Sequence, residues 1–270
     1  MSAAKICLVG AGNMGGAMLV GWLDAGYDPD SICVLDPAPS DEMVRLLSDK
    51  GVSHHFSAKN LASPELILLA VKPQIIADVL VGIRSLVNDN NVLVSVAAGT
   101  TIANLAAPFS GSPRIIRTMP NTPAQVGRGI TVCVANDAVD DDQKTMASDL
   151  LRAIGQVEWV DDEVLIDAVT GVSGSGPAYV FYMAEAMAAA GEKAGLPAEL
   201  AARLAKATVS GAGELMHQSS DTPAQLRKNV TSPNGTTAAA LDVLMADDGL
   251  GQLMQKAVAA ATKRSRELAK

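Results

Sequence analysis

The sequence predicts an α/β chain in two parts, a doubly wound parallel sheet over residues 1–160 and an all-helical domain over residues 161–270. Short apolar runs alternate with helical stretches in the first part, which is typical of βαβ units. The second part has long alanine-rich stretches and no strand-like run, which indicates helices alone. The length of 270 residues fits about two domains of roughly 100–200 residues each.

The expected strands are short and nearly all apolar, as in sheets that helices cover on both faces. They span residues 6–9, 32–35, 66–71, 92–97, 115–117 and 130–135. Helical patterns of the first part span residues 13–25, 40–49, 73–86 and 101–109. Those of the second part span residues 177–194, 198–217, 236–246 and 250–268. Glycines within the second set let helix axes approach closely, and an all-helical domain of this kind often serves subunit association.

Composition and charge exclude several classes of protein. Hydrophobic residues make up 49% of the chain and charged residues 19%, so a large core is available and disorder is excluded as the main state. A net charge of −8 disfavours nucleic acid and anionic membrane surfaces as main partners. We find no apolar run of the roughly 18 residues that a spanning helix needs, and we expect no signal peptide.

Cysteine and histidine usage points to a reduced, cytoplasmic protein without a metal. The three cysteines, Cys7, Cys33 and Cys133, each lie in an apolar strand-like run and are too few for a disulfide scaffold. The chain has no CxxC motif, and its three histidines lack ligand spacing. We interpret His54 and His55 as an exposed pair and His217 as a residue at a helix end, where a cation favours the dipole.

A glycine-rich segment after the first strand predicts a dinucleotide site. It is a GxGxxG motif in which Gly10 permits a tight turn, Gly12 lets the backbone approach a pyrophosphate, and Gly15 brings the helix close to the strand. The free N–H groups and dipole of the following helix favour an anion. An ordinary glycine-rich turn is the alternative. The residues expected to line the cofactor here are Val9, Gly10, Gly12, Asn13, Met14 and Gly15.

Asp36 ends the second strand, 21 positions after Gly15, where a Rossmann fold places the acid that binds a ribose 2′-hydroxyl. The alternative is a plain Asp-Pro turn with Pro37. The segment Asp36–Val44 contains no Lys or Arg and the next base is Arg45, so a 2′-phosphate would find no obvious cationic partner. Asp36 therefore favours NADH over NADPH.

Four further segments are unusual for their length. They are Leu69–Gln74 (LAVKPQ), Arg117–Pro123 (RTMPNTP), Gly171–Tyr179 (GVSGSGPAY) and Leu226–Thr237 (LRKNVTSPNGTT). The first two follow strands, where ligands of this fold bind. We expect the third to be a flexible joint before a long helix and the fourth to link two helices. Together they closely resemble pyrroline-5-carboxylate reductases, from the glycine loop to the last helices.

The resemblance implies a Rossmann domain and a helical domain that forms tight homodimers, often assembled into decamers, with the active site at the dimer interface. It implies reduction of L-1-pyrroline-5-carboxylate to L-proline by hydride from NAD(P)H, with NADPH the usual cofactor of the family. Cofactor contacts implied are Ala70, Val71, Lys72, Pro73, Val96, Ala97, Ala98, Met119 and Pro120. Lys72 has the alternative of a surface cation, and Arg117 is interpreted as structural.

The same resemblance assigns the substrate site. Implied substrate contacts are Asn121, Ser232, Gly235, Thr236 and Thr237, with Thr237 as the hydroxyl nearest the imine nitrogen. A capped helix with hydroxyls of no function is the alternative reading. The family's SPGGTT has Asn234 in place of a glycine here, a mild change because Asn tolerates left-handed backbone.

Two other functions remain open from the sequence. One is a β-hydroxyacid dehydrogenase or another small reductase on this plan, for which Lys193 and Lys206 are the nearest candidates for a catalytic lysine, neither in such a motif. The other is a non-catalytic nucleotide-sensing protein, which would not require the intact segment Ser232–Thr237.

Overall fold

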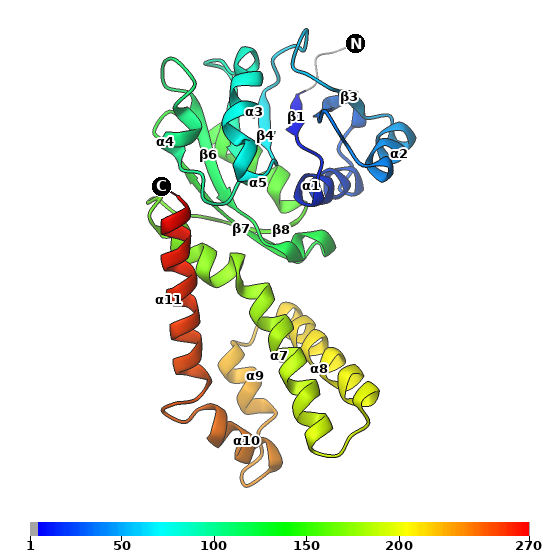
Figure 1. Ribbon diagram of the computed structural model, residues 1–270, viewed down its shortest axis with the longest axis vertical. Coiled ribbons are helices and arrows are strands. Elements are labelled where there is room, and N and C mark those ends of the chain that lie inside the picture. The colour runs from blue at the N-terminus through cyan, green and yellow to red at the C-terminus, as the bar shows by residue number, and fades with distance from the viewer. Residues whose placement is uncertain (1–4, 270) are drawn as a thin grey trace. The chain divides into compact units, whose positions relative to one another are not determined.

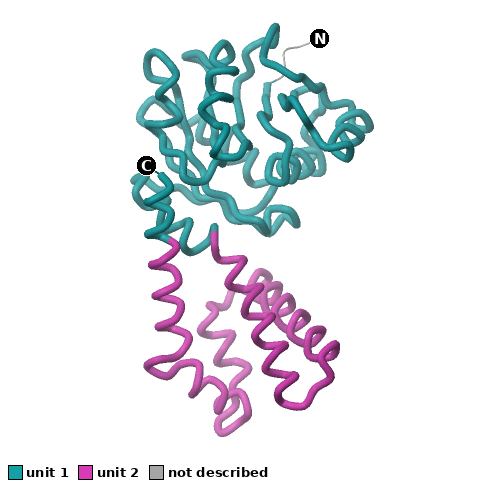
Figure 2. Tube along the Cα trace, viewed as in Figure 1, with its two compact units in different colours: residues 1–174, 262–270 teal, residues 175–261 magenta. Residues whose placement is uncertain are grey.

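The structure, a computed structural model, describes residues 5–269 (Figure 1). It divides into two compact units, which Figure 2 distinguishes by colour. Unit 1 comprises Met1–Gly174 and Thr262–Lys270, and unit 2 comprises Ser175–Ala261. No helix within residues 5–269 combines the length and apolar character needed to cross a bilayer.

Unit 1 is built on one eight-stranded sheet within the described residues, in the order β3-β2-β1-β4-β5-β6-β7-β8. The strands are β1 Ile6–Val9, β2 Ile32–Leu35, β3 Ser53–His55, β4 Leu66–Leu69, β5 Val92–Ser95, β6 Arg114–Met119, β7 Gly129–Ala135 and β8 Gly155–Trp159. The first six positions follow the Rossmann order, and every pair is parallel except β6 with β7. The predicted doubly wound sheet is confirmed, with one antiparallel pair that the sequence analysis did not anticipate.

Helices cover both faces of the sheet. One face packs against α1 Asn13–Asp24, α2 Asp41–Lys50 and α5 Asp141–Arg152, through side chains such as Leu19, Met43 and Leu150. The other packs against α3 Ile76–Gly82 and α4 Ile102–Ala106. Short 3₁₀ turns fill the connections at Pro29–Ser31, Pro73–Ile75, Arg84–Leu86 and Thr122–Val126.

Trp22 is the largest fully buried side chain and joins two of these helices. Its indole lies in the core against α5, and Nε1 donates a hydrogen bond to the carbonyl oxygen of Leu150 at 2.9 Å. Because the donor is satisfied, the indole is buried without an unpaired polar group.

The boundary between the two units falls within Gly171–Tyr179, where the sequence predicted a joint, and the chain is helical on both sides of it. After α6 Leu165–Val169, the residues Thr170–Gly174 form a π-helical turn that runs directly into α7. Pro177 lies in the first turn of α7, as expected for a helix start. The C-terminal end of α11 Leu250–Leu268 returns to unit 1, where Ser265 Oγ donates to Asp167 Oδ1 at 2.6 Å.

Unit 2 is helical throughout, as predicted. It contains α7 Gly176–Lys193, α8 Ala198–Gln218, α9 Pro223–Asn229, α10 Thr236–Leu244 and the first part of α11. The helix α9 lies partly within the segment 226–237, which the sequence analysis treated as a link between helices. Gly191 allows the close approach of α8, because a Cβ there would lie 3.3 Å from the Cβ of Ala201.

Unit 2 leaves much of its apolar surface exposed. Ala201 and Ala205 are its buried apolar side chains within the described residues, whereas Phe181 and Tyr182 on α7 are 68% and 69% exposed. Exposed apolar surface on this scale marks an interaction site in a protein of otherwise ordinary polarity. The helical unit therefore has the surface that subunit association requires.

Candidate active site

The carboxyl ends of five adjacent strands gather the predicted cofactor residues at one edge of the sheet. The strands β2, β1, β4, β5 and β6 are neighbours and run parallel, so their ends meet at the same edge. The residues that follow them are the glycine loop, Asp36, Ala70–Pro73, Val96–Ala98 and Met119–Asn121. Ligands of open α/β sheets bind at this edge, beside the crossover between β1 and β4.

Two glycines of the loop have the roles predicted from the sequence. Gly10 has a φ of 89°, and a Cβ there would lie 2.7 Å from Val71 Cγ1. A Cβ at Gly15 would collide with the carbonyl oxygen of Gly10. Both positions therefore require glycine, the first for a left-handed turn and the second for helix α1 to pack on the loop.

The N-terminus of α1 is open to an anion. Gly12 is its N-cap residue, no side chain caps it, and its first turn has no acidic residue. A Cβ built on Gly12 would have no heavy atom within 4 Å. The unpaired N–H groups and the positive end of the dipole fit the pyrophosphate of a dinucleotide, and Gly12 leaves space for its approach.

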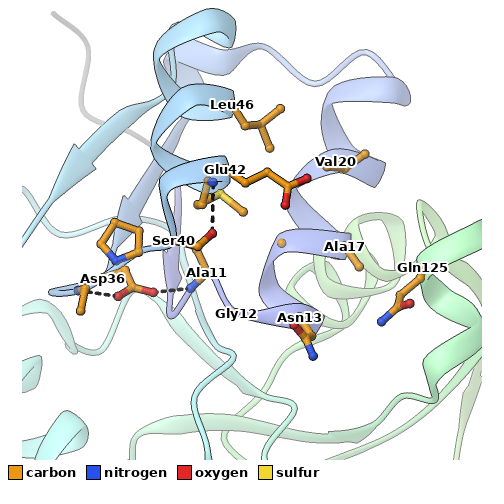
Figure 3. A pocket seen from close by; sticks show the side chains of 14 residues that line it. Ala11, Gly12, Asn13, Ala17, Val20, Asp36, Ser40, Glu42, Leu46 and Gln125 are labelled. Carbon is orange, nitrogen blue, oxygen red and sulfur yellow. Dashed lines mark hydrogen bonds between the residues drawn. The ribbon is translucent and has the colours of Figure 1, made fainter.

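Asp36 is fixed by two backbone N–H groups, which Figure 3 shows. Its Oδ2 accepts from Ala11 N at 2.8 Å, and its Oδ1 accepts from Ala38 N at 2.9 Å. The Ala38 contact is the turn that the sequence analysis held as an alternative. The Ala11 contact turns the carboxylate toward the glycine loop, and the remaining lone pairs are available to ribose hydroxyls.

A groove of about 640 Å³ begins at the glycine loop and passes between α1 and α2. It is lined at this end by Ala11, Gly12, Asn13, Asp36, Ala38 and Ser40. Glu42 extends into the groove from α2 toward α1 (Figure 3). The lining has two carboxylates and no lysine or arginine among the described residues that form it. Sequence reasoning missed Glu42 and also Gln125, which reaches the groove from a distant 3₁₀ turn.

The ends of β4 and β5 form the floor beside the loop. Ala70 N donates to Val9 O at 2.8 Å, and Val96 N donates to Leu69 O at 3.0 Å. The residues that follow β4 and β5 therefore continue the hydrogen bonding of the sheet for one position beyond each strand. Ala97 is buried, whereas Lys72 and Ala98 are exposed at the edge. Both readings of Lys72, cofactor contact and surface cation, fit this position.

The amide of Asn121 is engaged with backbone at both of its ends. Its Oδ1 accepts from Ile130 N at 3.0 Å, and its Nδ2 donates to Ser173 O at 3.2 Å. These bonds hold the loop after β6 against β7 and the π-helical turn. Sequence reasoning missed this positioning role. The contact of Asn121 with substrate stays a prediction. The second N–H of its side-chain amide is available for that contact.

Arg117 has the structural role predicted for it. It is 4% exposed, and its Nη1 donates to Glu163 Oε1 at 2.7 Å. The same oxygen accepts from Ile102 N at 2.8 Å, at the start of α4. This arrangement neutralises the buried guanidinium and ties β6 to α4.

The predicted substrate residues Ser232, Gly235, Thr236 and Thr237 lie in unit 2, around the start of α10. Asn234 has a φ of 58°, which confirms the left-handed backbone expected at this position. Gly235 N donates to Ser232 O at 3.1 Å, and Gly235 is the N-cap of α10 without a side-chain cap. Within the described residues, the hydroxyl of Thr237 makes no hydrogen bond, and the first turn of α10 has no acid. This helix start is suited to a carboxylate.

A Rossmann sheet with an open glycine loop, an acid after β2 and a second helical domain define a two-domain, dinucleotide-dependent oxidoreductase. Comparison with known proteins identifies the family. Residues 5–99 match the family model "NADP oxidoreductase coenzyme F420-dependent", and residues 163–268 match "Pyrroline-5-carboxylate reductase dimerisation". The chain belongs to the pyrroline-5-carboxylate reductase family.

Similarity to individual members extends over the whole chain. The pyrroline-5-carboxylate reductase of Pseudomonas aeruginosa is 40% identical over 100% of this chain and 98% of its own length. That of Glycine max is 38% identical over 96% and 94%. A solved structure of the Coxiella burnetii reductase matches with a TM-score of 0.92 at 37% identity, covering 100% of each chain. The Plasmodium falciparum reductase, solved with NADP bound, matches with a TM-score of 0.80 at 29% identity, covering 100% of each chain.

Proposed function

We propose that this chain reduces L-1-pyrroline-5-carboxylate to L-proline with a nicotinamide dinucleotide, the last step of proline biosynthesis. The observation that carries the proposal is the open glycine loop with the oriented carboxylate of Asp36, in a chain that aligns with pyrroline-5-carboxylate reductases over their full length. Residues 1–160 bind the dinucleotide, and residues 161–270 bind the substrate and form the dimer.

The reaction requires a hydride on the imine carbon and a proton on the imine nitrogen. A bound reduced nicotinamide supplies the hydride, so the protein needs no nucleophile of its own. The protein residues orient the two reactants, which is where proximity contributes most. Asp36 and the start of α1 hold the adenosine ribose and the pyrophosphate, and the segments after β4, β5 and β6 line the rest of the cofactor, up to Met119 and Pro120 beside the nicotinamide.

The start of α10 holds the substrate. The substrate carboxylate accepts from the backbone N–H groups of Thr236 and Thr237, where the helix dipole is favourable, while Gly235, whose own N–H donates to Ser232 O, forms the turn that leads into them. Ser232 contributes its hydroxyl to the same cradle. The hydroxyl of Thr237 orients the iminium nitrogen rather than protonating it, because a threonine hydroxyl is a poor acid. The proton arrives with the substrate or through water.

We further propose that NADH serves at least as well as NADPH. A 2′-phosphate placed beside Asp36 would face a carboxylate, and the groove lining offers Glu42 as a second negative charge. The relative from Plasmodium falciparum was solved with NADP bound, which argues for NADPH. We propose NADH for this chain because Asp36 and Glu42 would both repel a 2′-phosphate.

The assembly proposed is a homodimer through the helical domain, further associated as a decamer, in the cytoplasm. Support comes from the match to a dimerisation family model and from exposed apolar side chains such as Phe181 and Tyr182. Sedimentation velocity at micromolar concentration tests both levels of assembly.

The deciding experiment measures oxidation of NADH and of NADPH separately, each with pyrroline-5-carboxylate, and identifies proline as the product. We expect substrate-dependent oxidation with both cofactors and a kcat/KM for NADH no lower than for NADPH. Cofactor binding without substrate-dependent oxidation would instead support the nucleotide-sensing alternative.

A further inference from the structure

An exposed aromatic ring follows the strand beside Asp36, the residue that is proposed to bind the ribose. Phe56 is one of three phenylalanines in the chain, and its side chain is 69% exposed. It follows β3 directly, at the carboxyl edge of the sheet, where ligands of this fold bind. An aromatic ring left in water at a ligand-binding edge has apolar surface available to a ligand.

The pairing of β2 with β3 brings Phe56 beside Asp36. The two strands are parallel, with Leu35 in register with His55. One residue further along, Asp36 N donates to His55 O at 3.1 Å. Asp36 and Phe56 therefore leave the sheet side by side, one after each strand.

His54 links the two residues through its side chain. Its Nε2 lies 2.8 Å from the carbonyl oxygen of Asp36, and it donates because a carbonyl oxygen only accepts. The same imidazole packs edge-on against the Phe56 ring, with centroids 4.6 Å apart and an interplanar angle of 60°. The sequence analysis was wrong to expect an exposed histidine pair, since both are half-buried in β3.

We propose that Phe56 provides the stacking surface for the adenine base of the dinucleotide. The inference rests on the proposed function, in which Asp36 binds the hydroxyls of the adenosine ribose. Adenine is joined to that ribose by a single glycosidic bond, so it must lie within one ring's length of the carboxylate. Phe56 supplies an aromatic face there, and base stacking on aromatic side chains contributes substantially to affinity. Neither Asp36 nor the glycine loop can contact the base in this way.

The first test measures binding of ADP-ribose, which carries the adenosine and pyrophosphate but no nicotinamide, by titration calorimetry. We expect Phe56→Ala to raise the Kd by about 10-fold, within the range found when a base loses its aromatic partner. Phe56→Trp should bind within threefold of the wild type. Val81→Ala is the matched control, because Val81 is a similarly exposed apolar residue, 64% exposed, on α3 of the same unit, and it should leave the Kd unchanged.

A second readout separates stacking from structural damage. Reduced nicotinamide mononucleotide can donate hydride but has no adenosine, so its turnover by Phe56→Ala should equal that of the wild type. The KM for NADH should rise while kcat stays the same. A Phe56→Leu variant keeps an apolar side chain without a π-face, and it should resemble the alanine variant in ADP-ribose binding.

The outcomes distinguish this inference from the proposed function. If Phe56→Ala binds ADP-ribose within twofold of the wild type, the stacking role is overturned while the reductase assignment stands. Equal losses with NADH and with the mononucleotide also overturn it, since they indicate a disturbed fold. If the wild type neither binds ADP-ribose nor oxidises NADH with pyrroline-5-carboxylate, the proposed function fails and the inference fails with it.

Discussion

Replacing Asp36 with serine should shift cofactor preference toward NADPH by on the order of tenfold. The carboxylate carries the only charge of the β2–α2 connection before Asp41, and it faces the glycine loop through its bond to Ala11 N at 2.8 Å. Serine removes the charge and keeps a hydroxyl that can bind a phosphate oxygen. The variant therefore tests the charge at this position directly.

The magnitude follows from Coulomb's law. Two like charges about 4 Å apart repel by roughly 4 kcal/mol at an effective dielectric near 20. Asp36 is half-buried, so solvent and salt reduce this severalfold. About 1–2 kcal/mol should remain, which corresponds to a roughly 5–30-fold change in the ratio of rate constants.

The structure adds a consequence for the wild-type cofactor. Serine is too short to reach both Ala11 N and Ala38 N, so at least one N–H group loses its acceptor. We therefore expect kcat/KM for NADH to fall in the variant as well. The informative quantity is the ratio of the two kcat/KM values within each variant, measured at low salt and again at high salt, where the shift should shrink.

Asp41→Asn is the control for a general change of charge. Asp41 lies in the first turn of α2 but does not line the groove, so its removal should leave the ratio within about twofold. If the wild type strongly prefers NADPH and Asp36→Ser does not change the ratio, Asp36 does not face a 2′-phosphate. Its bond to Ala38 N would then be its whole role, as in a plain Asp-Pro turn.

Four further predictions concern the substrate loop, the two units and the core. Thr237→Ala should fold normally and lower kcat/KM by roughly 10–100-fold, for one lost hydrogen bond to a charged group, and unchanged kinetics would contradict its role. The segment 1–160 should bind cofactor weakly and show no reductase activity, because it lacks the substrate loop and the Glu163 partner of Arg117; a fully active fragment would disprove the division of labour. Sedimentation should show at least a dimer, and a monomer at micromolar concentration would refute the role of the exposed helices. Trp22→Ala should lower the free energy of unfolding by about 3–5 kcal/mol in a urea titration, since Trp22 is fully buried, and a loss under 1 kcal/mol would contradict its core role.

The centre of the sheet could be predicted from the sequence because its strands are buried on both faces. In β1, β4 and β5 all four residues are buried, and only apolar runs satisfy that condition at nearly every position. The two edge strands carried no such signal. β3 reads Ser-His-His, and β8 mixes Gln and Glu with Val and Trp, because an edge strand tolerates polar residues.

Contacts between distant segments explain what sequence reasoning missed at the site. Glu163 lies 46 positions from Arg117, and Ser173 lies 52 positions from Asn121. Neither pair leaves a periodicity or a local motif that a single sequence could reveal. The glycines, in contrast, could be interpreted because each role is local: a left-handed turn at Gly10, and contact between Gly15 and the loop five residues before it.

Asp36 shows why the two readings of an Asp-Pro dipeptide do not exclude each other. A carboxylate has two oxygens, and here Oδ1 accepts from Ala38 N in the turn while Oδ2 accepts from Ala11 N in the glycine loop. The turn therefore fixes the rotamer that presents the carboxylate to the loop before any cofactor arrives. Ordering the Asp36 side chain during binding would cost free energy. Because the side chain is already ordered in the free protein, that cost is avoided, which is the physical meaning of preorganisation. The His54 contact with the Asp36 carbonyl holds the same residue from its other side, so one imidazole joins the two proposed adenosine contacts, Asp36 and Phe56.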